Sequence, residues 1–230
     1  MKNPVAAAEP EQVQRMFDTI AGRYDLANHV LSCGFDFLWR AHAARIIAAD
    51  RPRKILDLAA GTGDLTLVLQ RKIPGAEIVA ADFSEEMLAI ARRKGVHHTL
   101  AADARQLPFP DGEFDAVTIA FGLRNLPHWG EGLREMVRVL RPGGRLLVLE
   151  FSLPENAMMR AAYRKYLHWW VPRVGSLLTK QQSAYDYLGE TIESFPRGNA
   201  MLRLIEQSGL NAAVAKPLTG GIVSIYTAVR

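Results

Sequence analysis

Short apolar runs alternate with amphipathic segments along the chain from residue 54 onward. The runs are typical of buried strands and cover residues 54–60, 77–83, 114–121 and 144–151. The segments between them carry apolar side chains at three- and four-residue spacing, as helices do, over residues 64–72, 84–94 and 129–140. Ser84 suits the N-cap of the second helix. This alternation predicts an α/β fold with a mostly parallel sheet and helices on both faces.

Three further runs complete the predicted sheet. Residues 97–103 predict a short strand, and residues 211–218 and 221–230 predict two closing strands. Because only the short stretch 219–221 joins the last two, we expect them to form an antiparallel hairpin. The prediction is therefore a mostly parallel, seven-stranded sheet with an antiparallel terminal hairpin.

Two regions lie outside this alternation. Residues 10–50 predict a helical cap ahead of the first strand, and residues 153–199 predict an insertion rich in aromatic and basic side chains. Both could cover the carboxyl edge of the sheet, where ligands of open α/β sheets bind. We expect one domain over 1–230, with a core at 53–151 and a closing helix and strands at 200–230.

Composition narrows the class of protein. The chain has 230 residues, 49% of them apolar, which fits one globular domain. Cys33 is the only cysteine, so no internal disulfide can form, and we expect a reducing, cytoplasmic location. No run approaches the roughly 18 apolar residues that a membrane-spanning helix needs. A net charge of +4 permits an anionic partner, nucleic acid or lipid head groups, without choosing between them.

The segment LDLAAGTGDLT, residues 56–66, suggests a ligand site. Gly61 and Gly63 let the backbone approach a ligand closely, and the next helix presents free N–H groups there. Asp82 follows about twenty residues later, at the end of the second strand, where a carboxylate suits ribose hydroxyls. Asp103 ends the third strand and, with the N–H of Ala104, could meet an adenine edge. These positions predict an adenosine compound; the alternative is that the glycines merely make a tight turn.

The glycine spacing separates two kinds of adenosine ligand. Dinucleotide enzymes use G-x-G-x-x-G, but Thr66 stands in place of the third glycine. The pattern Asp57-x-Ala59-x-Gly61-x-Gly63 instead resembles motif I of S-adenosylmethionine-dependent methyltransferases. ADARQLPFPDGEFDAV and EMVRVLRPGGRLLVLEF resemble later motifs of that superfamily. The resemblance covers 53–151 and implies a Rossmann-like class I fold that binds S-adenosyl-L-methionine.

A closer resemblance extends along nearly the whole chain. YDLANHVLSCGFDFLWR, AFGLRNLP, RVLRPGGRLLVLEFS and YDYLGETIESFP are similar to segments of the ubiquinone/menaquinone biosynthesis C-methyltransferases. That family methylates a ring carbon of a prenylated quinol. Ala120 departs from relatives that often have serine, so any contact there falls to the backbone. The cofactor-binding residues that the motifs and the resemblance together indicate are Asp57, Gly61, Thr62, Gly63, Asp82, Asp103, Ala104 and Ala120.

Carbon methylation requires an electron-rich ring carbon beside the sulfonium methyl. Ionising the neighbouring hydroxyl supplies the electrons, so the site should contain a base, or a cation that lowers the pKa of that hydroxyl. Arg124 and Asn125, just past the fourth strand in AFGLRNLP, are the catalytic candidates. The guanidinium would stabilise a developing phenolate and the amide would fix the ring oxygen. Arginine is too basic to remove the proton, which we assign to water or an unidentified group, with His29 and His128 as alternatives. The alternative for Arg124 is a surface ion pair.

The substrate side is expected among aromatic and amide side chains. Tyr24, Asp25 and Asn28 share a helical face, and Tyr24 and Asn28 would line the quinol pocket; the alternative is helix packing. Tyr185 and Tyr187 would line the same pocket or pack the insertion. Ser32, Trp39 and Arg40 are interpreted as structural. His97 and His98 lack the spacing of a metal site, and no metal site is predicted elsewhere in the chain.

The choice of quinol rests on the resemblance. Asp36 stands where ubiquinone-branch relatives tend to have histidine, which favours demethylmenaquinol as the substrate, in menaquinone biosynthesis, with the ubiquinone branch left open. Two alternatives remain: a methyltransferase for another small molecule, and a binding protein that transfers nothing. Nucleic acid is not expected as a partner, because the charge excess is small.

A membrane contact is the last prediction. In YRKYLHWWVPR, cations could meet anionic head groups while aromatics lie at the interface, with an ordinary lid helix as the alternative. The cations are Arg160, Arg164, Lys165 and Arg173. The aromatics are Tyr163, Tyr166, Trp169 and Trp170. We expect peripheral contact with the inner face of the cytoplasmic membrane, and a homodimer is one option for the assembly.

Overall fold

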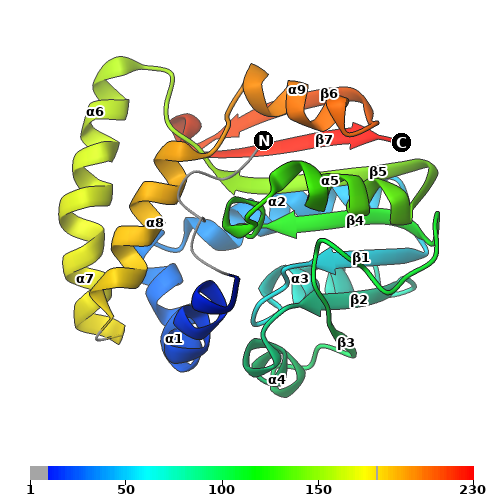
Figure 1. The fold of residues 1–230 in the computed structure, drawn as a ribbon, viewed down its shortest axis with the longest axis horizontal. Coiled ribbons are helices and arrows are strands. Elements are labelled where there is room, and N and C mark those ends of the chain that lie inside the picture. Colours follow the sequence, from blue (N-terminus) through cyan, green and yellow to red (C-terminus); the bar gives the residue numbers. More distant parts are fainter. Residues whose placement is uncertain (1–9, 180) are drawn as a thin grey trace.

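A seven-stranded sheet forms the centre of the computed structural model, which describes residues 10–179 and 181–230 (Figure 1). The strand order is β3-β2-β1-β4-β5-β7-β6, and the pairings of β7 with β5 and with β6 are antiparallel, whereas the others are parallel. The strands are β1 (Lys54–Leu58), β2 (Glu77–Asp82), β3 (His98–Ala101), β4 (Phe114–Ala120), β5 (Leu140–Phe151), β6 (Asn211–Leu218) and β7 (Val223–Val229). The predicted fold class is confirmed, including the terminal hairpin.

β6 matches its predicted range, and the other six strands differ from theirs by one to four residues at an end; β1 and β5 are two examples. β1 ends at Leu58, and Ala59 has a positive φ of 51°, which takes the chain out of the sheet before residue 60. β5 begins at Leu140, which pairs with Phe114 across an irregular register, rather than at 144. The RPGG segment therefore lies within the strand.

Helices cover both faces of the sheet, as the apolar spacing predicts. α5 (Trp129–Val139) and α9 (Asn199–Gln207) pack on one face through Leu133, Met136 and Ile205. α2 (Phe35–Ala49) and α3 (Asp64–Lys72) pack on the other through Ile47 and Leu69. α4 (Glu85–Arg93) begins at Ser84, whose Oγ accepts the Met87 N–H at 3.1 Å, so the predicted N-cap is confirmed.

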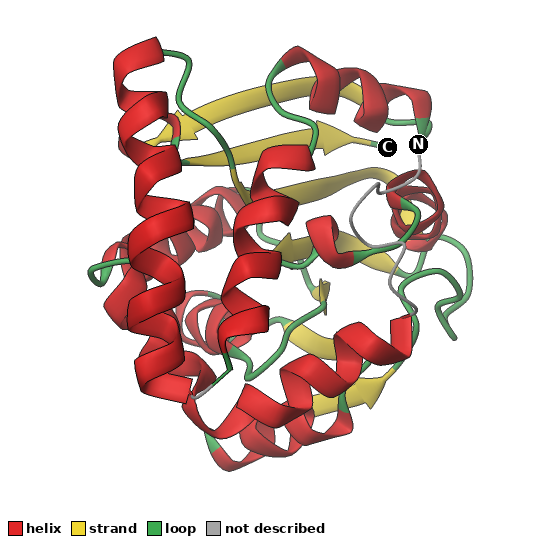
Figure 2. Cartoon of the chain, turned by 60° about the vertical axis from the view of Figure 1, so that its left-hand side comes forward, coloured by secondary structure: helices red, strands yellow, loops and turns green. Residues whose placement is uncertain are grey.

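A helical layer stands at the carboxyl ends of the parallel strands, on the left of Figure 1. It contains α1 (Pro10–Leu31), α6 (Ala157–Lys165), a π-helical turn (Tyr166–Trp170), α7 (Val171–Thr179) and α8 (Gln182–Ser194). Figure 2 shows α6 and α7 continuing as one rod beside α8. A separate apolar cluster that includes Ala27, Leu167 and Ile192 holds this layer together. Within the described residues, no helix combines the length and apolar character needed to cross a membrane.

Candidate active site

The loop after β1 is shaped by glycines with left-handed backbone angles. Gly61 has φ 57° and Gly63 has φ 81°. A Cβ on Gly63 would lie 2.5 Å from Val96 Cγ2 and 3.1 Å from Ala91 Cβ, whereas one on Gly61 would meet nothing within 4 Å. Gly63 therefore permits close packing against α4, and Gly61 keeps the space in front of the loop open.

Asp82, at the end of β2, is held by backbone donors. Its Oδ2 accepts the Gly61 N–H at 2.7 Å, and its Oδ1 accepts the Ser84 N–H at 2.9 Å. Burial raises the pKa of this carboxyl, and the backbone hydrogen bonds act in the opposite direction. The loops after β1 and β2 are thereby joined around one carboxylate.

Asp57 is fully enclosed beneath that loop. It accepts hydrogen bonds from the hydroxyls of Thr66 at 2.6 Å and Thr118 at 2.7 Å, so it ties β1 to α3 and β4. Burial raises its pKa from 3.8 to about 6, against the effect of both hydroxyls. These contacts give Asp57 a framework role at the floor of the loop.

The first of two cavities lies against these loops, and we call it the loop cavity. Of the eight predicted cofactor residues, it is lined by Asp57, Gly61, Thr62, Asp82, Asp103, Ala104 and Ala120. Gly63 does not line it and packs behind the loop instead. Asp103 already pairs with Arg105, whose guanidinium lies 2.7 Å from Oδ2 and helps to lower the pKa of the carboxyl. The structure thus brings the predicted set together at one sheet edge.

The second cavity lies among the helices of the covering layer, and we call it the helical cavity. It is mainly apolar, and its walls include Leu31, Phe151, Leu167 and Ile192. All four predicted substrate residues line it: Tyr24, Asn28, Tyr185 and Tyr187. The two cavities share four wall residues, Tyr24, Arg40, Phe121 and Asn125. A ligand in one cavity therefore borders a ligand in the other.

Arg124 lies in a 3-10 turn (Leu123–Asn125) after β4 and is only 4% exposed. Its Nη1 is 2.7 Å from Oε1 of Glu150, a fully buried residue on β5, and also donates to the Phe121 carbonyl. The guanidinium lines the helical cavity and lies 5.3 Å from the centre of the Phe151 ring. The alternative of a surface ion pair was wrong about exposure: the pair exists, and it is buried.

Asn125 stands at the junction of the cavities. Its Nδ2 approaches the Phe121 carbonyl at 3.5 Å, while its Oδ1 is buried and has no hydrogen-bond partner among the described residues. An unsatisfied buried acceptor costs free energy, and such an atom at a cavity wall is suited to a ligand donor.

Tyrosines supply further polar groups of the helical cavity. Burial raises the pKa of Tyr24, and a hydrogen bond to Asn28 acts against that rise. Burial raises the pKa of Tyr187 to about 12, and its buried hydroxyl has no partner among the described residues. Tyr185 has a packing role as well, because its ring occupies the space in front of Gly175 on α7.

Asp25 turns away from the helical cavity, although the spacing grouped it with Tyr24 and Asn28. Its carboxylate accepts the Thr62 hydroxyl at 2.5 Å and pairs with Lys94 Nζ at 2.8 Å. Lys94 also pairs with Asp64 at 2.5 Å. These contacts fasten α1 to the loop after β1, and sequence reasoning missed them because the partners lie far apart in the chain.

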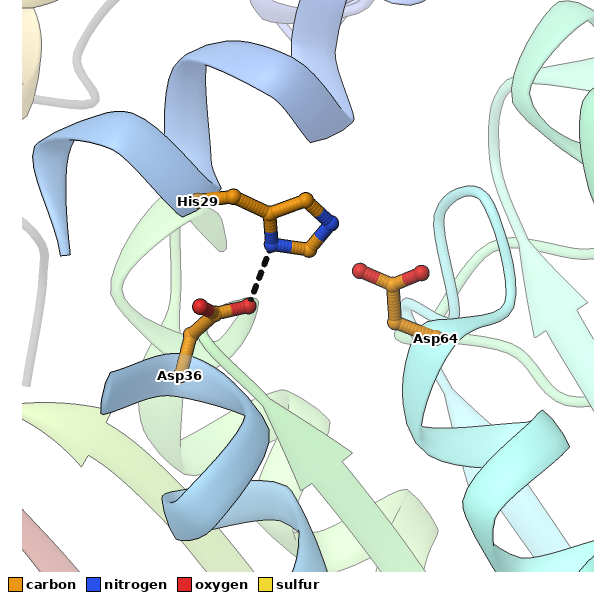
Figure 3. Close-up of side chains that lie close together, drawn as sticks. All are labelled: His29, Asp36 and Asp64. Atoms are coloured by element: carbon orange, nitrogen blue, oxygen red, sulfur yellow. Dashed lines mark hydrogen bonds and ion pairs between the residues drawn. The ribbon is translucent and has the colours of Figure 1, made fainter. Parts of the chain in front are cut away.

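The structure also groups His29, Asp36 and Asp64, which Figure 3 shows at close range. His29 Nδ1 lies 2.7 Å from Asp36 Oδ2. Arg40 donates to Asp36 and lies 3.3 Å from Asp64, so one guanidinium already pairs with both carboxylates. The arrangement is an ion-pair network and does not match an open metal site.

Arg40 has a larger role than the structural one predicted for it. It lies at the wall of both cavities and 5.5 Å from the centre of the Phe121 ring. The four-residue spacing of Asp36 and Arg40 was the available signal. His29 and His128, the alternative bases, are not among the described residues that line the two cavities. Ser32 and Trp39 do line the helical cavity.

Two of the aromatics predicted at a membrane interface lie inside the protein. Tyr163 is 8% exposed, and the Tyr166 hydroxyl donates to the Leu31 carbonyl at 2.5 Å. Both line the helical cavity, and the burial of Tyr163 shows that its predicted interfacial position was wrong. Trp169 and Trp170 are 60% and 53% exposed, as a surface role requires.

Comparison with known proteins agrees with this geometry. A solved SAM-dependent methyltransferase from Thermotoga maritima has a TM-score of 0.66 at 18% identity, covering 94% of this chain and 98% of that one, and shares the fold. The demethylmenaquinone methyltransferase of Thermus thermophilus is 46% identical over 94% of this chain and 100% of its own length. The ubiquinone/menaquinone biosynthesis C-methyltransferase UbiE of Pseudomonas fluorescens is 39% identical over 100% of this chain and 93% of its own. The model of the ubiE/COQ5 methyltransferase family matches residues 5–230, and the chain belongs to that family.

Proposed function

We propose that the protein transfers the methyl group of S-adenosyl-L-methionine to a ring carbon of a prenylated quinol, demethylmenaquinol, in menaquinone biosynthesis. Family membership and the names of the relatives support the reaction class and the quinol. The observation that carries the proposal is the wall shared by the two cavities. Asn125 and Tyr24 border both, so a methyl donor in one and a ring in the other would be neighbours.

The loop cavity fits the cofactor. The open space before Gly61 admits a ligand close to the backbone, and Asp82 lines the cavity with its carboxylate already positioned by two N–H groups. Asp103 and Ala104 line the far part, suited to a purine edge. When bound, the cofactor supplies an electrophilic methyl group. The chain's own residues hold it and keep water out.

The helical cavity fits a ring with an apolar tail. Asn125 Oδ1 can accept a hydrogen bond from the ring hydroxyl, which fixes the position of the ring. Arg124 would stabilise a developing phenolate, although Glu150 offsets part of its charge. Asp36 is the carboxylate among the described residues that line this cavity, but its hydrogen bonds to Ser32 and His29 and the charge of Arg40 hold its pKa low despite burial. It is therefore a weak base, and water remains the proton acceptor.

The proposal is tested by transfer of labelled methyl to short-chain demethylmenaquinol and to its methoxy-benzoquinol counterpart under reducing conditions. Labelled naphthoquinol alone places the protein in the menaquinone branch, and both products mean that it serves both branches. Cofactor binding without either product would favour another small-molecule acceptor or a binding protein that transfers nothing.

Peripheral membrane contact and a homodimer belong to the same proposal. A polyprenyl tail makes the substrate insoluble in water, so the enzyme must meet it at a lipid surface. The exposed Trp169 and Trp170 are one candidate surface for such contact, and vesicle sedimentation tests whether the protein binds lipid. Sedimentation equilibrium tests the homodimer.

A further inference from the structure

The helical cavity opens to the surface beside the start of α2. Five of its lining residues are themselves exposed: Cys33, Phe35, Met159, Ala162 and Thr219. Phe35 is 45% and Met159 is 44% exposed, so each has one side in the cavity and one in solvent. We call these five residues the cavity mouth.

Direct contacts hold the elements of the mouth together. Trp39 Nε1, on α2, donates to the Thr219 hydroxyl at 2.8 Å. The next residue, Gly220, lies so close to α6 that a Cβ there would be 2.6 Å from Met159 Sδ. The first turns of α2 and α6 therefore stand on two sides of one opening, with the β6–β7 turn between them.

Large apolar side chains project from this rim into solvent. Leu38 is 63% exposed and lies one turn beyond Phe35 on α2, and Met158 is 82% exposed beside Met159 on α6. Neither Leu38 nor Met158 lines the cavity. An apolar rim around an apolar cavity is a surface that a soluble ligand alone would not require.

Cations flank the rim. Arg45 is exposed two turns beyond Leu38 on the same side of α2, and Lys216 is exposed on the strand that leads into Thr219. Burial, and after it the charges of Lys216 and Arg45, lower the pKa of His42, which places both cations around that residue. Lys165 is exposed at the end of α6, and Glu155, three residues before Met158 in the chain, is an exposed acid. The exposed charges near the mouth thus favour an anionic partner.

We propose that the cavity mouth and its rim form the surface that docks on an anionic lipid bilayer, so that a prenylated acceptor passes from the membrane into the helical cavity without crossing water. Phe35, Leu38, Met158 and Met159 enter the interface, and Arg45 and Lys216 meet the head groups. This inference rests on the proposed quinol substrate. It places the membrane at the first turns of α2 and α6, and the Trp169–Trp170 surface further along the rod does not carry the contact.

The test compares two variants of the full-length protein by sedimentation with vesicles of phosphatidylcholine and phosphatidylglycerol, and of phosphatidylcholine alone. The rim variant is Leu38→Glu with Met158→Glu. The control is Leu177→Glu, because Leu177 is also 82% exposed but lies at the far end of the α6–α7 rod (Figure 1). We expect wild type and control to bind anionic vesicles, and the rim variant to bind at least about tenfold more weakly. Equal binding by the rim variant, equal loss in the control, or no binding by wild type would overturn the proposal.

Two further measurements separate docking from chemistry. The rim variant should methylate a water-soluble, tail-free acceptor at the wild-type rate and lose activity only on a long-chain acceptor held in vesicles. If Trp169→Glu loses vesicle binding while the rim variant still binds like wild type, the membrane surface lies elsewhere and the inference is overturned. A wild type that binds vesicles but methylates neither acceptor would instead contradict the proposed function while leaving the docking surface in place.

Discussion

The backbone N–H of Gly61 donates to the carboxylate of Asp82 at 2.7 Å, and this hydrogen bond joins the loops that follow two neighbouring parallel strands. It makes the shape of the glycine loop and the position of the carboxylate depend on each other. A ligand that contacts Asp82 therefore meets a group whose direction is fixed before binding, which lowers the ordering cost of recognition.

Gly61→Ala and Gly63→Ala should separate binding from folding. At Gly61 the positive φ should cost an alanine about 1–2 kcal/mol of backbone strain. The added methyl also enters the open space in front of the loop, so we expect the cofactor dissociation constant to rise at least about tenfold. At Gly63 the methyl overlaps Val96 in addition to the strain, so the loss of stability should exceed that of Gly61→Ala by about 1–3 kcal/mol. Urea unfolding and calorimetry of cofactor binding measure both. Equal stability losses would contradict the packing role of Gly63.

Asn125→Ala should lower turnover without lowering stability. Its Oδ1 is buried and without a partner among the described residues, so its removal costs the fold little. Loss of the acceptor that positions the ring hydroxyl should reduce kcat about a hundredfold. Asn125→Asp is the matched variant, since it keeps the shape but places a negative charge beside a developing phenolate. A normal kcat in Asn125→Ala would remove this residue from the mechanism.

Arg124→Ala should lower stability as well as turnover. The change leaves Glu150 charged and buried, which typically costs about 3–5 kcal/mol. The double variant Arg124→Leu with Glu150→Leu should recover most of that loss and stay inactive. Denaturant unfolding beside the methyl-transfer assay distinguishes the two effects. An active double variant would show that Arg124 serves only the fold.

Asp57 should make stability fall as the pH rises. Its folded pKa of about 6 lies above its ordinary value of 3.8, so the folded state binds the proton more tightly. The free energy of unfolding should decrease between about pH 4 and pH 6, by about 3 kcal/mol in total from this group, and then level off. Asp57→Asn should remove that part of the slope. Identical pH profiles for the two proteins would mean that Asp57 is not the source.

Asp25→Asn should speed release of the cofactor. The change weakens the pairing with Lys94 that fastens α1 over the loop cavity, and both side chains are partly exposed, so the effect is about 1 kcal/mol or less. We expect about threefold faster dissociation in stopped-flow experiments. Because salt screens such pairs, 0.5 M salt (about 4 Å screening length) should speed wild type and leave the variant nearly unchanged. An equal response of wild type and variant to salt would show that the Asp25–Lys94 pair does not control release of the cofactor.

The periodicity of apolar residues was sufficient to predict the sheet and its facing helices, because burial sets that pattern locally. The glycine loop, Asp82 and Asp103 could be placed at one edge because parallel strands share a direction. The chain's pairing of Lys94 with Asp25 could not be predicted, since the two lie 69 residues apart and only the fold brings them together. The same holds for Arg124 and Glu150, which meet across β4 and β5. Tyr163 was misplaced because the apolar face of a helix has the same pattern whether it packs against the protein or meets a lipid surface.

The π-helical turn at Tyr166–Trp170, which we call the spacer, sets the rotation of α7 relative to α6 about the axis of the α6–α7 rod. A π turn accommodates one more residue than an α turn, and each residue of a helix advances the side-chain direction by about 100°. Gly175, against which the Tyr185 ring lies, comes after the spacer and depends on it for its orientation. Deleting one residue here would therefore rotate α7 rather than shorten it, carrying Gly175 away from Tyr185 and opening the wall of the helical cavity.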